Sequence, residues 1–161
     1  MLIKALALAT SVIVVQQTAV KSPPVDGLHL AINAAVAAAD GDIRTTPAGC
    51  KKDELARTIC TYQLSNGVSV KALAREEKGP IKSIDVELPG GKEAASKLFK
   101  TTALLAMAFV PDVPDAELNA LMNALVQARK NMYGDASQRY RNLDFSIKLD
   151  DKRNTLVLIV D

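Results

Sequence analysis

Two acidic residues, Asp85 and Glu87, stand two positions apart in a stretch of alternating polar and apolar residues. Successive side chains of a β-strand point to opposite faces, so both carboxylates leave the same face of the expected strand. Such a pair could serve a hydrolase as acid and base. Lys71 and Arg75, on the preceding expected strand, could balance both charges, which is typical of a solvated sheet face. We favour the solvated face and keep the carboxylate-based hydrolase as an alternative.

Nucleophilic catalysis would need a base beside a serine or cysteine. The sequence contains one histidine, His29, and no glycine-rich nucleophile elbow surrounds any serine. We therefore expect His29 to be an exposed or capping residue. No catalytic residue is assigned, and the chain is predicted not to be an enzyme.

The two cysteines, Cys50 and Cys60, do not form a CxxC pair, and one histidine leaves a zinc site short of ligands. Met107, Met122 and Met132 have no cysteine or histidine neighbours and are interpreted as core residues at helical spacing. We expect no metal and no cofactor. The cysteines predict one structural disulfide, which would stabilise the fold by roughly 2–3 kcal/mol for a loop of this length.

Gly90-Gly91-Lys92 lies between an expected strand and an expected helix, where backbone N–H groups can bind an anion. The phosphate-loop pattern is incomplete, because no glycine stands five positions earlier and no serine or threonine follows Lys92. The break between strand and helix explains both glycines. No anion site is therefore assigned.

Cations and tyrosines gather in the last third of the chain. This basic cluster consists of Arg129, Lys130, Tyr133, Arg139, Tyr140 and Arg141, with Asp135 as the one acid among them. It could contact a phosphate, an acidic glycan or an acidic protein surface. Part of it also falls in the last turns of an expected helix, where cations complement the helix dipole. We take the basic cluster as the candidate partner surface and Asp85 and Glu87 as a weaker alternative.

Residues 1–22 are predicted to be a signal peptide. Lys4 gives a positively charged start, and an uncharged apolar run follows from Ala5 to Val15. That run is too short to span a membrane but typical of a signal-peptide core. We expect cleavage at about residues 19–22, with residues 23–161 forming a single domain. No stable membrane anchor is expected after cleavage.

Removal of residues 1–22 also changes the charge balance. It takes away two of the 20 Lys and Arg residues and none of the 18 Asp and Glu residues, so the remaining chain is neutral. A neutral domain offers no general attraction for nucleic acid or for an anionic membrane. The signal-like start and the two cysteines together predict a periplasmic or secreted protein.

Hydrophobic periodicity predicts strands in two groups. From Ile59 the period changes to two, and Asn66-Gly67 predicts a tight hairpin. The first group comprises 59–64, 68–75 and 82–88. After a polar loop at 134–142, the second group comprises 143–149 and the continuous apolar run 156–160, which is typical of a central strand with both faces covered.

Helical spacing predicts three helices, at 28–39, 92–110 and 115–133, with Asp26 as the N-cap of the first. Asp53 and Arg57 lie four apart, as in a helical turn between the cysteines. The expected order is α-βββ-αα-ββ. This is an α+β domain with a mostly antiparallel five-stranded sheet covered by helices.

We therefore predict an exported, non-enzymatic binding protein, such as an inhibitor or an accessory factor. Its expected partner is a protein or a cell-envelope component. The alternative is a carrier of a small apolar ligand held between the sheet and helix 92–110. That helix is more apolar than a simple cover needs, and its alanines leave room.

Overall fold

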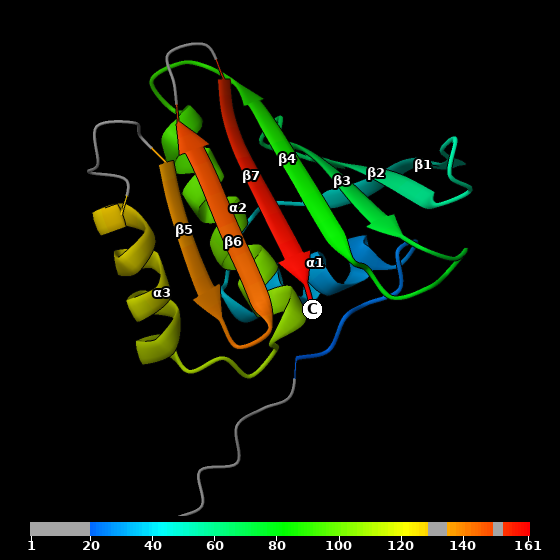
Figure 1. Ribbon diagram of the computed structural model, residues 1–161. Helices are drawn as coiled ribbons and strands as arrows, with labels where there is room; N and C mark the ends of the chain where they lie inside the picture. Colours follow the sequence, from blue (N-terminus) through cyan, green and yellow to red (C-terminus); the bar gives the residue numbers. More distant parts are fainter. Residues whose placement is uncertain (1–19, 129–134, 150–152) are drawn as a thin grey trace, which may run out of the picture.

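The computed structural model describes residues 20–128, 135–149 and 153–161, which form three helices and one seven-stranded antiparallel sheet. In chain order the elements are α1 (Leu28–Ala38), β1 (Thr45–Lys52), β2 (Thr58–Leu64), β3 (Ser69–Ala74), β4 (Ser83–Pro89), α2 (Ala94–Phe109), α3 (Asp115–Ala128), β5 (Asp135–Tyr140), β6 (Leu143–Leu149) and β7 (Arg153–Val160). In Figure 1, α1 and α2 lie behind the sheet, and α3 lies alongside β5. The predicted α+β class and the Cys50–Cys60 disulfide are confirmed.

The sheet consists of two meanders that meet in its middle. Its strand order is β1-β2-β3-β4-β7-β6-β5, and every neighbouring pair is antiparallel. The chain therefore leaves the first meander at β4, passes through α2 and α3, and enters the second meander at its far edge (Figure 1). The two outermost strands, β1 and β5, each pair with one neighbour.

The expected count of five strands is wrong, because the pattern missed both outermost strands. In β1 only Thr45 is buried, and Pro47 and Gly49 interrupt the sequence around a bulge. β5 lies within the predicted polar loop 134–142, and of its residues only Ala136 is buried. Outermost strands bury little, so they lack the alternation that predicts strands, and their pairing is imposed by the neighbouring strand.

The expected helical turn between the cysteines is also wrong, because this segment is the turn of the β1–β2 hairpin. Asp53 Oδ1 accepts backbone hydrogen bonds from Leu55 and Arg57, and its other oxygen accepts one from the Arg57 guanidinium. Ala56 adopts φ +59°. The four-residue spacing between Asp53 and Arg57 therefore stabilises a hairpin turn and not a helical turn.

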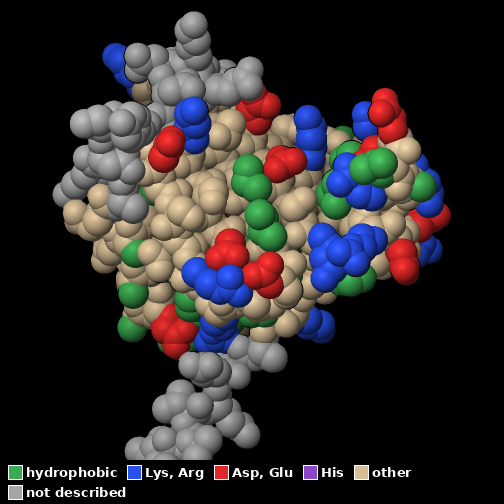
Figure 2. Space-filling view, in the orientation of Figure 1, with side chains coloured by type: hydrophobic (Ala, Val, Ile, Leu, Met, Phe, Trp, Pro, Cys, Tyr) green, Lys and Arg blue, Asp and Glu red, His purple; other side chains and the backbone are tan. Residues whose placement is uncertain are grey.

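The strand at 156–160 lies in the middle of the sheet as predicted, within β7, but only one of its faces is covered. Leu156, Leu158 and Val160 are buried, whereas Ile159 is 47% exposed. The helices cover one face of the sheet, and the opposite face, seen in Figure 2, is open. Five apolar residues in a row therefore do not require two covering layers.

The helices match their predicted positions, and α1 and α2 are each shorter than expected by one to three residues. The cap of α1 is Gly27, without a side-chain cap bond, so Asp26 is not the N-cap. In α2 the hydroxyls of Thr101 and Thr102 donate to the carbonyls of Lys97 and Leu98, which lets both polar residues be buried. The predicted continuation of the third helix through 129–133 lies outside the described residues.

Candidate functional site

An apolar groove lies between α1, the C-terminal end of α2 and the chain segment that precedes α1. Its volume is about 370 Å³. Five of its lining residues are alanines and three are prolines. Leu30, which is 66% exposed, stands in the lining on the α1 side, and Met107 contributes from α2. A volume of this size lies within the range of small-ligand sites, which are mostly apolar.

The wall contributed by α1 follows from the spacing of its residues. Ala31, Ala34 and Ala38 recur at intervals of three and four, so they share one helix face. Leu28 and Ile32 lie on a neighbouring face and are fully buried in the core. Because alanine side chains end at Cβ, the outward face of α1 leaves a depression where longer residues would fill the space.

The chain segment before α1 forms the third wall and is fixed by hydrogen bonds. The Lys21 N–H donates to the carbonyl of Phe109 at 2.8 Å, which holds the segment to the end of α2. The Ser22 hydroxyl donates to the carbonyl of Ile81 at 2.9 Å, and the Ile81 N–H donates to the carbonyl of Pro23 at 3.2 Å. Residues 21–23 are thus joined to both α2 and the β3–β4 connection.

Among the described residues, Lys21 is the one charged residue that lines the groove. Its side chain is exposed and forms no ion pair with the part of the chain that the structure describes. Asp26 and Asp112 adjoin lining residues in the chain, but neither lines the groove. The groove therefore combines an apolar surface with one unpaired cation.

The alternative from the sequence is a small apolar ligand held between the sheet and helix 92–110, whereas the groove in the structure is lined by α1, the end of α2 and residues 21–24. The α2 side chains of Leu98, Leu105 and Phe109 are fully buried in the core. The groove lies at the end of α2, against α1. The signal for it in the sequence is the alanine spacing of α1.

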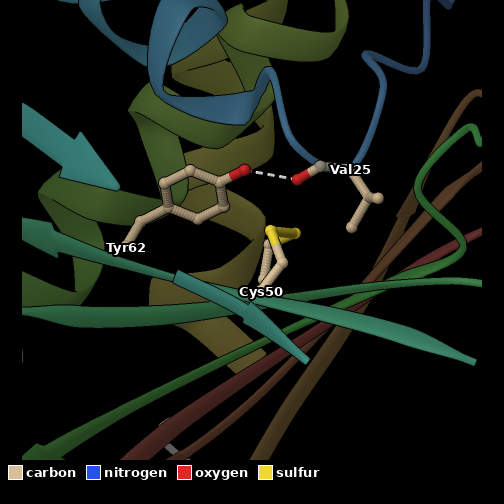
Figure 3. Close-up of a disulfide and its surroundings, with 4 residues drawn as sticks. Val25, Cys50 and Tyr62 are labelled. Atoms are coloured by element: carbon tan, nitrogen blue, oxygen red, sulfur yellow. Dashed lines mark hydrogen bonds between the residues drawn. A yellow bond between two sulfur atoms is a disulfide. The ribbon is translucent and has the colours of Figure 1, made fainter. Parts of the chain in front are cut away.

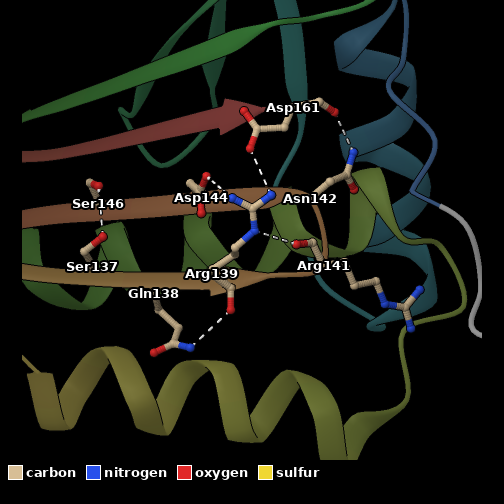
Figure 4. Close-up of polar contacts among 8 residues, drawn as sticks. All are labelled: Ser137, Gln138, Arg139, Arg141, Asn142, Asp144, Ser146 and Asp161. Atoms are coloured by element: carbon tan, nitrogen blue, oxygen red, sulfur yellow. Dashed lines mark hydrogen bonds and ion pairs between the residues drawn. The ribbon is translucent and has the colours of Figure 1, made fainter.

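The basic cluster is described only in part: Arg129, Lys130 and Tyr133 lie outside the described residues. The Arg139 guanidinium lies between two carboxylates, 3.0 Å from Asp144 and 2.9 Å from Asp161 (Figure 4). Its Nε also donates to the carbonyl of Arg141 at 3.0 Å. Arg139 therefore joins the β5–β6 turn to the last residue of the chain.

Tyr140 and Arg141 both bind Glu117 of α3. The Tyr140 hydroxyl donates to Glu117 Oε2 at 2.6 Å, and the Arg141 guanidinium donates to the same oxygen at 3.1 Å. The Arg141 guanidinium also lies over the Tyr140 ring, 5.2 Å from its centroid. The predicted cations and tyrosine thus brace α3 against the end of β5.

These contacts shift two pKa values. The hydrogen bond from Tyr140, together with that from Arg141, holds the pKa of Glu117 below its usual range. Burial, with the hydrogen bond to Glu117, raises the pKa of Tyr140 to about 12. Both groups therefore keep the protonation states that their hydrogen bond needs across the physiological range.

Asp85 and Glu87 lie together on the open face of the sheet, and both are exposed. Asp85 stands opposite Lys71 of β3, as predicted for a solvated face. Arg75, expected to complete the balance, follows the end of β3 at Ala74 and has no register partner in β4. Figure 2 shows charged side chains of both signs on this face.

The disulfide joins directly opposite residues of β1 and β2, with the two Cα atoms 4.0 Å apart. Beside it the Tyr62 hydroxyl donates to the carbonyl of Val25, just before α1 (Figure 3). Burial raises the pKa of Tyr62 to about 12. His29 stacks on the Tyr62 ring with the centroids 5.9 Å apart, so it is a packing residue and not the exposed or capping residue expected.

Comparison with known proteins leaves the site to be interpreted from its geometry. No protein-family model, no curated protein and no solved structure matches this chain. Within residues 20–128, 135–149 and 153–161, no three His, Cys, Asp or Glu side chains gather as a metal site. None of the helices in those ranges is long and apolar enough to cross a membrane.

Proposed function

We propose that this protein is an exported, non-enzymatic binding protein whose binding site is the groove between α1 and α2. The supporting observation is an apolar depression of about 370 Å³ with an exposed leucine in its lining. When a partner covers apolar surface that is open to water, the free energy of the complex falls by about 25 cal/mol per Å² buried. Binding is the function that this geometry serves best.

Export is part of the proposal, and it is supported by the disulfide, which is consistent with an oxidising compartment. Within the expected cleavage range, a cut after Ala19 is favoured. A cut after Val20 would remove a residue that packs against the core, and a later cut would remove the hydrogen bonds of Lys21 or Ser22. The intact mass of the exported protein measures this. A mature chain that begins at Val20 is expected, and a full-length chain would contradict the export proposal.

Filling the groove tests the binding site. Ala34→Leu places a larger side chain on the groove wall, whereas Ala37→Leu makes the same change at an exposed α1 position outside the lining. The unsubstituted exported protein is first used in a pull-down from envelope extract, and the bound material is identified. We expect the Ala34→Leu variant to recover none of this material and the Ala37→Leu variant to recover it in full. Equal retention by both variants, at equal thermal stability, would show that the groove is not the binding site.

A second candidate is a macromolecular partner on the open sheet face, supported by the exposure of Ile159 in its middle. Ile159→Asp would introduce an unpaired charge there without touching the groove. Loss of the retained partner in this variant, with Ala34→Leu unaffected, would move the binding site to the sheet. The double change Arg139→Ala and Arg141→Ala is less informative, because both arginines brace the fold.

A further inference from the structure

We propose that the groove binds the hydrocarbon chain of a single-chain amphiphile, with an anionic head group placed at Lys21. This inference rests on the proposed function, since it names the class of ligand for the same groove. It follows from three properties of the lining: its shape, its chemistry and the position of its one charge.

The shape suits a narrow, flexible chain. Ala31 and Ala38 mark the two ends of the alanine face of α1, and at 1.5 Å per residue they are separated by about 10 Å along the helix axis. The groove thus extends over about two turns of α1. The described residues of its lining include no aromatic side chain that would stack against a planar ring. Alanine, proline and methionine surfaces instead contact a methylene chain through dispersion along its length.

The charge at the groove favours an anion. Lys21 is the one ionisable group that the described part of the chain contributes to the lining, and its backbone bond to Phe109 keeps it beside the apolar wall. None of the lining residues in the described ranges is a carboxylate, so a carboxylate, phosphate or sulfate head would meet an ammonium without a competing acid from them. Cleavage after Ala19 would add the α-ammonium of Val20 one residue away.

A membrane surface fits these residues less well than a free amphiphile. Binding to an anionic bilayer needs several clustered cations beside the apolar surface. Here one lysine is available, and the exposed carboxylates of Asp26 and Asp112 adjoin the lining residues. These acids would repel an extended anionic surface more than a single head group held at Lys21.

The direct test is calorimetric titration of the exported protein, after removal of co-purified lipid, with decanoate and with the neutral n-decyl maltoside. We expect decanoate to bind more tightly. Lengthening the chain from octanoate to decanoate should strengthen binding by about fourfold per methylene while the groove still has room, as expected for burial of each group.

Three variants separate the contributions. Lys21→Gln should weaken decanoate binding by about two- to fivefold, the range for an exposed ion pair, and should not affect decyl maltoside. Ala34→Leu should weaken both ligands, and Ala37→Leu should affect neither. This pattern would support a chain in the groove and a head group at Lys21.

The outcomes also separate this inference from the proposed function. If neither amphiphile binds while Ala34→Leu still loses the pulled-down partner, the ligand class is wrong and the binding site stands. If both amphiphiles bind equally and Lys21→Gln changes nothing, the anionic head group is wrong. Binding to phosphatidylglycerol vesicles but not to monomeric decanoate would also overturn the inference. If Ala34→Leu changes no binding of any kind, both proposals fail.

Discussion

The two edges of the sheet are held in place by different means. At the β1 edge the contacts are close in sequence. The Cys50–Cys60 disulfide spans ten residues, Asp53 binds Arg57 within the same turn, and the Asn33 amide of α1 binds the backbone of Thr45. At the β5 edge they are distant in sequence: α3 packs alongside the strand, and Glu117 binds Tyr140 and Arg141, which lie 23 and 24 residues away.

The difference shows how each edge is kept from pairing with another chain. An outermost strand presents unpaired backbone groups, and proline, bulges and lysine are the usual protections. β1 carries Pro47, a bulge before Gly49, and Lys51 and Lys52. β5 has no proline or lysine and is instead flanked by a helix. The β1 edge is thus protected by its own sequence, and the β5 edge by tertiary packing.

The largest expected effect is at the β5 edge. Leu125 of α3 is fully buried, so Leu125→Ala should lower the free energy of unfolding by about 2–5 kcal/mol, through lost burial and the remaining cavity. Val126→Ala, at the neighbouring 39% exposed position, is the control and should cost much less. Urea denaturation measures both. Equal losses would mean that α3 does not hold this edge through its buried face.

Reduction of the disulfide should have the next largest effect, at the opposite edge. Opening a loop of this length should cost about 2–3 kcal/mol, because the unfolded chain gains conformational entropy. Urea denaturation with and without a phosphine reductant measures this, and a Cys50→Ala/Cys60→Ala variant, which the reductant cannot affect, is the control. Amide exchange should increase in β1 and β2 more than in β5 and β6. A uniform increase would contradict local bracing.

The smallest effects concern the two carboxylates, whose pKa values are both lowered: that of Glu117 by Tyr140 and Arg141, and that of Asp53 chiefly by the Arg57 side chain. A lowered pKa gives stability that is present above the unfolded-state value and is lost as the pH falls through the folded-state value. Glu117→Gln and Asp53→Asn should each reduce stability at neutral pH, and the difference from the unsubstituted protein should shrink in acid.

Amide exchange distinguishes the two substitutions. Asp53→Asn should expose amides of the β1–β2 turn alone, since Asp53 binds within that turn. Glu117→Gln should expose both α3 and the end of β5, because its contacts join them. A difference from the unsubstituted protein that grows as the pH falls would contradict the pairing of either carboxylate.

The sequence alone was sufficient where a signal is local. Alternation predicted β2, β3, β4 and β6, Asn66-Gly67 predicted the β2–β3 hairpin, and the two cysteines predicted the disulfide. Helical spacing located α1 and α2 to within about two residues. Each of these features depends on residues that are close together in the chain. The local sequence pattern is therefore enough to predict which side chains are buried and where the turns lie.

Tertiary structure decided what depends on neighbours far away in the chain. β5 reads as a polar loop, and only its pairing with β6 makes it a strand. The sequence predicts a free basic surface at residues 139–141. In the fold this surface is paired with the carboxylates of Asp144, Asp161 and Glu117. The groove likewise needs the end of α2 and residues 21–23 beside α1. The local sequence shows which residues are apolar or charged. Which residues bury them or pair with them depends on how distant segments pack together.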